Sequence, residues 1–199
     1  MTDVPRETLL QLEQFLAGPG IERGLIGPRE APRLWDRHIL NCAVVAWEPG
    51  LIPDGASVVD VGSGAGLPGV VWAMCRPDLT VTLVESLQRR TIFLTELVEE
   101  FDLSARVSVI RSRAEDLHEQ TFDVATARAV APLPRLLPWL APLTRGSILA
   151  LKGQTAADEV GQAAPVARRL GLSEAEIVTV GTGVTDPPTT VVRYLTTTT

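Results

Sequence analysis

The sequence is poor in cysteine, histidine and aromatic residues, and these scarcities exclude several kinds of site. Two cysteines and two histidines occur in 199 residues, and 5% of the residues are aromatic. Cys42 and Cys75 both lie in apolar helical patterns, so we expect buried free thiols and no disulfide. Cys and His are nowhere clustered at the spacing of metal ligands, and we therefore predict that the protein binds no metal.

Long hydrophobic runs are also missing. The longest apolar runs are far shorter than the roughly 20 residues that cross a bilayer. The segment Met1-Thr2-Asp3 lacks the basic and apolar regions of a signal peptide. We therefore expect a cytoplasmic protein that does not contact a membrane.

Positive charge is in short supply, and it comes almost entirely from arginine. The formal net charge is −6, and Lys152 is the only lysine in the chain. An acidic balance argues against a free-standing nucleic-acid binder, which is usually basic. It leaves open an enzyme that meets RNA through a local patch, where arginine can make bidentate contacts with phosphate.

Glycines gather in one short stretch that follows an apolar run. Residues 57–61 predict a buried strand, four glycines follow between residues 62 and 69, and the apolar spacing over residues 67–75 predicts a helix. Glycines at such a turn allow the backbone to approach a bound ligand closely. The helix N-terminus adds unpaired N–H groups for a polar or negative end of that ligand.

The glycine spacing has two readings. G-x-G-x-x-G over residues 64–69 fits the dinucleotide fingerprint. G-x-G-x-G over residues 62–66, opened by Asp60, resembles motif I of the methyltransferases that use S-adenosylmethionine (AdoMet). Both readings require an acidic residue at the end of the next strand to hold ribose hydroxyls, and Glu85 supplies it.

Strands and helices alternate along the rest of the chain. Periodicity predicts further strands at residues 79–85, 107–110, 122–126, 147–151, 175–180 and 190–195. It predicts further helices at residues 4–17, 33–47, 87–101, 132–143 and 156–170, with Gly18-Pro19-Gly20 as a helix stop and residues 20–32 as a loop. This alternation indicates parallel crossovers in an open, doubly wound sheet.

The end of the chain breaks the alternation. A loop of about eight residues joins the last two predicted strands, and a parallel crossover needs a dozen or more, so these strands should pair antiparallel. A seven-stranded doubly wound α/β sheet with an antiparallel last strand resembles the Rossmann-like class I AdoMet-dependent methyltransferase fold. We predict a helical extension at residues 1–50 and a class I methyltransferase domain at residues 51–199, in a single globular unit.

Ligands of open α/β sheets lie beyond the carboxyl ends of the strands. Those ends offer Gly62 to Gly66, Glu85, the segment from Arg113 to Asp116, Arg128 and Lys152. We expect Glu85 to hold the ribose, Ala114-Glu115 to flank the adenine, and Arg128 to lie near the methionine carboxylate or the substrate entrance. Each residue also has a simpler interpretation. Glu85 would be a solvated acid in a loop, Glu115-Asp116 would cap a helix, and Arg128 would be a surface charge.

Two missing motifs narrow the chemistry. The sequence has no Asn/Asp-Pro-Pro-Tyr/Phe after the strand at residues 122–126, the motif used to methylate exocyclic amino groups, and no Pro-Cys pair for C5 methylation. The target should therefore already be nucleophilic, as the ring nitrogen N7 of guanine is. Catalysis then reduces to positioning and desolvation. We expect no general base and assign no catalytic residue.

Several segments together resemble one family. Residues 60–69 read Asp-Val-Gly-Ser-Gly-Ala-Gly-Leu-Pro-Gly, which resembles the glycine-rich motif of the RsmG family, also called glucose-inhibited division protein B. Further motifs of that family are matched by Arg37-His38-Ile39-Leu40, Glu85-Ser86, Arg113-Ala114-Glu115, Ala127-Arg128-Ala129 and Leu151-Lys152-Gly153. The resemblance runs from about residue 22 to residue 180.

The resemblance implies a bacterial cytoplasmic enzyme that uses AdoMet to form 7-methylguanosine in 16S ribosomal RNA, near the decoding site. Its partner would be 16S rRNA or the small ribosomal subunit, and we expect a monomer. With the glycine turn, the expected AdoMet contacts are Gly62, Gly64, Gly66, Leu67, Glu85, Ser86, Leu87, Ala114, Glu115 and Arg128. Arg37, His38 and Lys152 are expected to face RNA or the target base, although His38 reads equally as a core histidine.

The sequence departs from the family pattern in its expected RNA-facing parts. Gly24-Leu25-Ile26 stands for Asn-Leu-Thr, Asn41-Cys42 stands for Asp-Ser, and the last strand has Arg193 but no lysine. These departures concern RNA docking and not AdoMet binding. Three other hypotheses stay open: a class I methyltransferase of a small molecule or protein, a non-catalytic AdoMet-binding module, and an NAD-dependent dehydrogenase.

Overall fold

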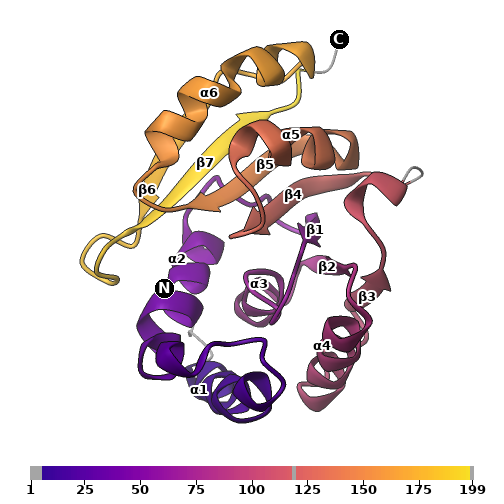
Figure 1. Ribbon diagram of the computed structural model, residues 1–199, viewed down its shortest axis with the longest axis vertical. Helices are drawn as coiled ribbons and strands as arrows, with labels where there is room; N and C mark the ends of the chain where they lie inside the picture. Colours follow the sequence, from indigo (N-terminus) through magenta and orange to yellow (C-terminus); the bar gives the residue numbers. More distant parts are fainter. Residues whose placement is uncertain (1–5, 118–119, 198–199) are drawn as a thin grey trace.

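The computed structural model describes residues 6–117 and 120–197, and its centre is a seven-stranded sheet (Figure 1). The strand order is β3-β2-β1-β4-β5-β7-β6. The strands are β1 (Ser57–Val61), β2 (Thr80–Glu85), β3 (Val107–Arg111), β4 (Phe122–Arg128), β5 (Thr144–Lys152), β6 (Glu176–Val180) and β7 (Thr189–Leu195). β1 to β5 pair in parallel, and β7 runs antiparallel to both of its neighbours, β5 and β6. The predicted fold class is confirmed.

Helices cover both faces of the sheet (Figure 1). They are α1 (Arg6–Phe15), α2 (Asn41–Trp47), α3 (Gly69–Cys75), α4 (Gln88–Glu100), α5 (Leu133–Leu140) and α6 (Ala156–Arg169). The first four pack on one face and the last two on the other. The first two residues of the helix predicted at 4–17 lie outside the described residues.

Side-chain alternation along the strands builds two cores. Val58 of β1 packs among α1 to α4, whereas Val59 and Val61 pack toward α5 and α6. A strand buried on both faces reads as a continuous apolar run, because successive side chains point to opposite faces. Cys42 and Cys75 are buried free thiols in the first core, as predicted.

The N-terminal segment differs from the prediction. Gly18-Pro19-Gly20 does not stop the first helix, since a π-helical turn at Leu16–Gly20 continues it and the chain turns at Gly24, with φ +69°. Pro19 cannot donate the α-helical hydrogen bond, and the wider π turn accommodates that loss. The loop predicted at residues 20–32 also ends early, in a 3-10 helix at Pro28–Arg33.

A second π-helical turn leads into α2. Leu34–Leu40 is π-helical and continues directly into the α-helix, so the helix predicted at residues 33–47 has a widened first half. The indole Nε1–H of Trp72 in α3 donates to the Cys42 carbonyl at 2.9 Å. The N-terminal helices therefore share a core with the sheet, and the domain division at residue 50 stays a prediction.

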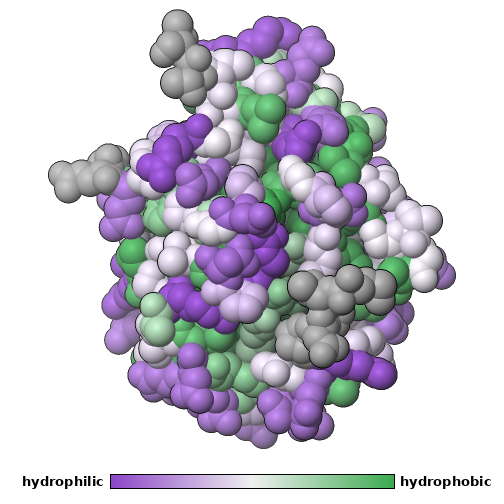
Figure 2. All heavy atoms as spheres, turned by 180° about the vertical axis from the view of Figure 1, so that it is seen from behind, coloured by the Kyte–Doolittle hydropathy of each residue, from purple (hydrophilic) through white to green (hydrophobic). Residues whose placement is uncertain are grey.

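The surface seen from behind mixes hydrophilic with hydrophobic residues (Figure 2). Within the described part of the chain, no helix combines the length and apolar character needed to cross a bilayer.

Candidate active site

The glycine turn joins β1 to α3 in a conformation that side chains would obstruct. Gly62, Gly64 and Gly66 have φ values of +71°, +57° and +89°. A Cβ on Gly62 would lie 2.7 Å from Cγ2 of Val130, and one on Gly66 would lie 2.7 Å from Cγ2 of Val70. The turn therefore needs glycine both for its backbone conformation and for its close neighbours.

Asp60 anchors the turn from inside the core. Its carboxylate is fully buried, and Oδ2 accepts the Gly69 N–H at 3.0 Å, at the start of α3. Oδ1 has no hydrogen-bond partner among the described residues. Burial raises the pKa of Asp60 to about 7, against the opposing effect of the bond from Gly69. In the sequence, Asp60 is the residue that opens the glycine motif, but no pattern indicated this unsatisfied buried oxygen.

Glu85 lies at the end of β2, next to the turn. The Gly62 N–H donates to the Val84 carbonyl at 2.8 Å, so the turn and the end of β2 are hydrogen-bonded neighbours. The Glu85 side chain is buried; Oε1 accepts the Leu87 N–H at 3.0 Å, and Oε2 lies 3.4 Å from Nη1 of Arg90. A carboxylate has about four acceptor sites, so it can still accept bonds from hydroxyl donors.

The other predicted AdoMet contacts border the same edge. Ser112 donates its N–H to the Glu85 carbonyl at 3.2 Å, which brings the 3-10 turn at Ala114–Asp116 beside the end of β2. Ala114 is buried and Glu115 is exposed. Ser86 is exposed and Leu87 has 45% of its surface exposed, whereas Leu67 is buried in the core. The structure therefore brings these predicted residues together, with Leu67 facing inward.

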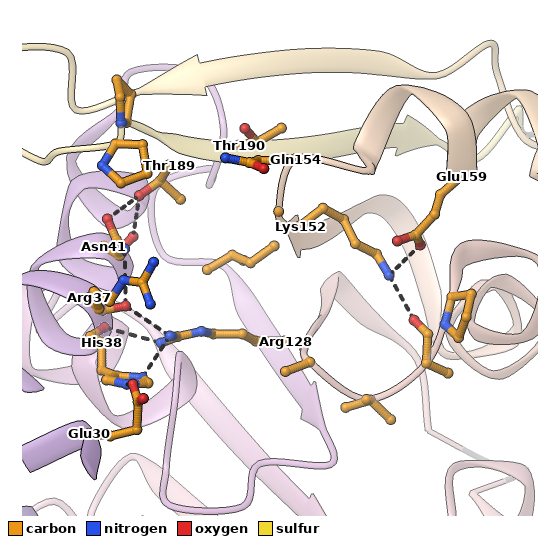
Figure 3. A pocket seen from close by; sticks show the side chains of 18 residues that line it. Glu30, Arg37, His38, Asn41, Arg128, Lys152, Gln154, Glu159, Thr189 and Thr190 are labelled. Carbon is orange, nitrogen blue, oxygen red and sulfur yellow. Dashed lines mark hydrogen bonds and ion pairs between the residues drawn. The ribbon is translucent and has the colours of Figure 1, made fainter. Parts of the chain in front are cut away.

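A cleft of about 830 Å³ lies beyond the ends of β4 and β5 (Figure 3). It is lined by Glu30, Arg37, His38, Asn41, Arg128 to Pro132, Leu151 to Gln154, Glu159 and Pro187 to Thr190. Gly62, Glu85 and Ala114 are not among its lining residues. Val130 lines the cleft and also lies against Gly62, so the glycine turn borders the cleft wall at this residue.

Arg128 reaches from β4 to the N-terminal helices rather than into open space (Figure 3). Its Nη2 donates to the Arg37 carbonyl at 2.9 Å and lies 2.8 Å from Nδ1 of His38. Its Nη1 donates to the His38 carbonyl and to Sγ of Cys42, both at 3.2 Å. The role of Arg128 as a cation near the methionine carboxylate or the substrate entrance stays a prediction. Its hydrogen bonds to Arg37, His38 and Cys42 show that it links β4 to the N-terminal helices across the cleft wall.

His38 is held on both ring nitrogens. Nε2 lies 2.9 Å from Oε2 of Glu30, and Nδ1 faces the guanidinium of Arg128. Because a guanidinium can only donate, Nδ1 must accept and Nε2 must carry the proton. Burial lowers the pKa of His38, and the nearby Arg128 lowers it further, although the bond to Glu30 opposes them. His38 is therefore a neutral link, and the sequence offered no signal for its partner Glu30.

Lys152 ends β5 and points away from Arg128 (Figure 3). Its Nζ donates to the Ala131 carbonyl at 2.7 Å and forms an ion pair of 2.8 Å with Oε2 of Glu159 in α6. The Lys152 side chain is 9% exposed. The lysine thus lines the cleft wall with its charge already paired.

Comparison with known proteins identifies the family. A family model described as GidB, rRNA small subunit methyltransferase G, matches residues 6–186. The chain belongs to this family. Relatives named ribosomal RNA small subunit methyltransferase G are 55% identical over 188 residues in Salinispora tropica and Thermobifida fusca. These matches cover 90% and 93% of this chain and 76% and 78% of the relatives.

Solved structures agree on the fold. The magnesium protoporphyrin IX methyltransferase of Synechocystis PCC 6803, solved with bound SAM, has a TM-score of 0.61 at 14% identity and covers 98% of this chain and 99% of its own. An O-methyltransferase family protein of Burkholderia thailandensis has a TM-score of 0.59 at 16% identity and covers 96% and 70%. At such identities the likeness concerns the class I fold alone.

One departure of this methyltransferase G family member has a structural role. Asn41 donates Nδ2–H to the Arg37 carbonyl at 3.0 Å, and its Oδ1 accepts from Oγ1 of Thr189 at 2.8 Å. Asn41 therefore joins the N-terminal helices to the start of β7, 148 residues away. Arg37 itself is exposed on the cleft wall.

The site of this family member suits AdoMet on its own geometry. A Cβ on Gly64 would meet nothing nearer than the Gly62 carbonyl at 3.8 Å, so the backbone is open to a ligand there, and Glu85 keeps acceptor capacity at the strand end. The unpartnered Oδ1 of Asp60 is a further buried polar atom beside the turn. Across residues 6–117 and 120–197, no group of three or more His, Cys, Asp and Glu side chains is placed to hold a metal ion.

Proposed function

We propose that this methyltransferase transfers the methyl group of AdoMet to N7 of a guanine in 16S rRNA. Membership of the rRNA small subunit methyltransferase G family supports the reaction and the substrate class. The observation that carries the proposal is the glycine turn over buried Asp60, with Glu85 on one side and the cleft on the other. The proposal includes a cytoplasmic location and a monomeric enzyme, as the sequence predicted.

The glycine turn and the neighbouring cleft suit two different substrates. We assign the turn, Glu85, Leu87 and the Ala114–Asp116 segment to AdoMet. The cleft, at about 830 Å³, is within the usual 300–1,000 Å³ range of small-molecule pockets and can admit one nucleotide. Val130 lies between them, against Gly62, so a base in the cleft would approach the turn at this point.

The proposed reaction requires the target base to be positioned correctly and requires no proton transfer. When bound, AdoMet supplies a sulfonium methyl group whose carbon accepts the N7 lone pair, while the C–S electrons stay on sulfur. N7 carries no proton, so no base has to remove one. The cleft matches this requirement, because both nitrogens of His38 are already engaged and Lys152 is paired with Glu159. The residues of the walls act by orienting the base and excluding water.

The test is transfer of labelled methyl from AdoMet to small ribosomal subunits that lack the modification. Naked 16S rRNA and large subunits serve as controls, and the product is identified after nuclease digestion. We expect 7-methylguanosine at one site, from the wild type and from Glu100→Gln, whose side chain is exposed on α4. Glu85→Gln should transfer less at limiting AdoMet. Label at another atom, or on the large subunit, would refute the proposed substrate, and bound AdoMet with no transfer to any RNA would indicate a non-catalytic module.

A further inference from the structure

The loop between β4 and α5, residues 129–132, is held from two sides by one ion pair (Figure 3). Lys152 binds the carbonyl of Ala131 at 2.7 Å, and Oε2 of Glu159 accepts the N–H of Leu133 at 2.9 Å. Lys152 and Glu159 themselves are 2.8 Å apart, with side chains 9% and 18% exposed. The pair therefore bonds to the backbone on both sides of Pro132, at Ala131 and at Leu133.

This loop lies between the glycine turn and the cleft. Ala129 has a φ of +56°, an unusual conformation for a residue with a side chain, and it needs support from its surroundings. Val130 follows it and presses on Gly62, and the whole loop lines the cleft. A shift of the loop would therefore move Val130 away from Gly62 and displace the cleft wall at the same time.

We propose that Lys152 and Glu159 are positioning residues that set the loop at residues 129–132 between the AdoMet turn and the target cleft. Lys152 then acts through the backbone of the loop and does not contact an RNA phosphate. This inference rests on the proposed function, since it takes the turn and the cleft as the cofactor and target sites.

Charge and burial explain why the pair acts as a unit. Burial alone would raise the pKa of Glu159, but the hydrogen bonds from Lys152 and from the Leu133 N–H outweigh it and lower the pKa. Glu159 thus stays charged beside the lysine. Removing either partner leaves the other, mostly shielded charge without an opposite charge, although each keeps a hydrogen bond to the backbone. This loss is more disruptive than that of a surface pair. The two single variants should therefore resemble each other.

The first experiment needs neither AdoMet nor RNA. Hydrogen–deuterium exchange is measured in Lys152→Met and Glu159→Met, with Arg145→Met as the control. Arg145 lies at the opposite end of β5 and is also ion-paired, to Asp123. We expect the Leu133 amide to exchange about tenfold faster in Glu159→Met, because its hydrogen bond to a charged group is lost. It should also exchange faster than in the wild type in Lys152→Met, because Glu159 loses the lysine that holds it in place, and at the wild-type rate in the control. Unchanged exchange in both test variants would overturn the proposal.

The second experiment separates positioning from RNA contact. Misplacement of the wall should lower kcat on small subunits by up to about a hundredfold in both test variants, with KM for the subunits and its salt dependence unchanged. The double variant Lys152→Met/Glu159→Met should be no worse than either single one. A lysine that contacted phosphate would instead raise KM and reduce the salt slope by about one in Lys152→Met alone, which would overturn the proposal.

Two further readouts keep the outcomes distinct. If the wild type methylates no RNA, the proposed function fails, but the exchange rates and AdoMet affinity by calorimetry still decide the positioning role. If a methionine variant fails to fold, Glu159→Gln replaces it. That variant keeps an acceptor for the Leu133 N–H and loses the charge, so positioning predicts a milder fall in kcat, and full activity with unchanged loop exchange would refute it.

Discussion

Replacing Asp60 with asparagine should remove one specific pH dependence from the stability of this protein. The Asp60 carboxyl is fully buried, and burial raises its pKa from 3.8 to about 7. One oxygen accepts the Gly69 N–H and the other has no partner among the described residues. Asparagine keeps the shape and an acceptor oxygen but cannot ionise.

The sign and size follow from proton linkage. The folded pKa lies above the unfolded one, so this group's stabilising contribution is complete below pH 3.8 and is lost as pH rises through about 7. Between pH 5 and pH 7 the folded state holds about one extra proton, and each pH unit is worth about 1.4 kcal/mol. From pH 5 to pH 8 the wild type should therefore lose about 3 kcal/mol relative to Asp60→Asn.

The assay is urea unfolding of the apoprotein at pH 5, 6, 7 and 8. The quantity to follow is the difference in unfolding free energy between Asp60→Asn and the wild type, because other titrating groups cancel in it. That difference should grow in favour of the variant as pH rises. Asp123→Asn is the matched control: bonds from Ser57 lower the pKa of Asp123 below 3.8, so this variant should keep the wild-type dependence between pH 5 and pH 8.

Parallel stability curves for Asp60→Asn and the wild type would refute the reasoning. They would mean that Asp60 stays ionised in the folded protein, which requires a donor for its second oxygen, such as a buried water molecule. The turn would then carry a fixed negative charge at neutral pH.

Four other perturbations test the site. Glu85→Ala should weaken AdoMet binding about 10- to 100-fold, because a buried acceptor of ribose hydroxyls is lost; unchanged affinity by calorimetry, compared with Glu100→Ala, would remove the ribose assignment. Arg128→Ala should lower the unfolding free energy in urea by about 2 kcal/mol, since the Arg37 carbonyl and Nδ1 of His38 lose their donor; a loss no larger than in Arg89→Ala, an exposed arginine, would make it a surface charge. His38 has a lowered pKa, so its contribution is complete above its usual pKa of 6.5 and is lost as pH falls below it; urea unfolding between pH 7 and pH 5 should show a wild-type decline that His38→Gln lacks, and equal declines would contradict the neutral tautomer. Arg37→Ala should raise KM for small subunits and reduce the salt slope by about one, whereas an unchanged slope would exclude a phosphate contact.

The parts of the site that the sequence predicted are those set by local rules. The apolar run of β1 leads directly into the glycines, and the apolar pattern of β2 ends at Glu85; because β1 and β2 pair in parallel, the two strand ends meet. The short connection before β7 implied an antiparallel pair, which the structure contains. These features depend on residues that are neighbours in the chain or in adjacent strands.

Partners far apart in the sequence could not be predicted in this way. Arg128 and His38 are 90 residues apart, and Thr189 and Asn41 are 148 apart. No spacing in the sequence encodes such pairs, since they exist only when the N-terminal helices pack beside the ends of β4 and β7. The sequence therefore suggested that Arg128 and Lys152 are free to contact a ligand, whereas in the structure both are bonded to other parts of the chain. Lys152 and Glu159 are only seven residues apart, but α6 begins between them. The distance between their side chains therefore could not be predicted from their spacing in the sequence.

The paired state of these cations bears on the reaction. Methylation of N7 leaves the guanine ring with a positive charge, and an unpaired cation in the cleft would oppose that charge as it develops. Lys152 meets Glu159 on one wall, and Arg128 is linked through His38 to Glu30 on the other (Figure 3). Of the arginine and lysine side chains that line the cleft, Lys152 is thus held next to a carboxylate and Arg128 is one residue away from one. Exposed Arg37, which also lines the cleft, is then the side chain suited to attract a phosphate of the RNA backbone.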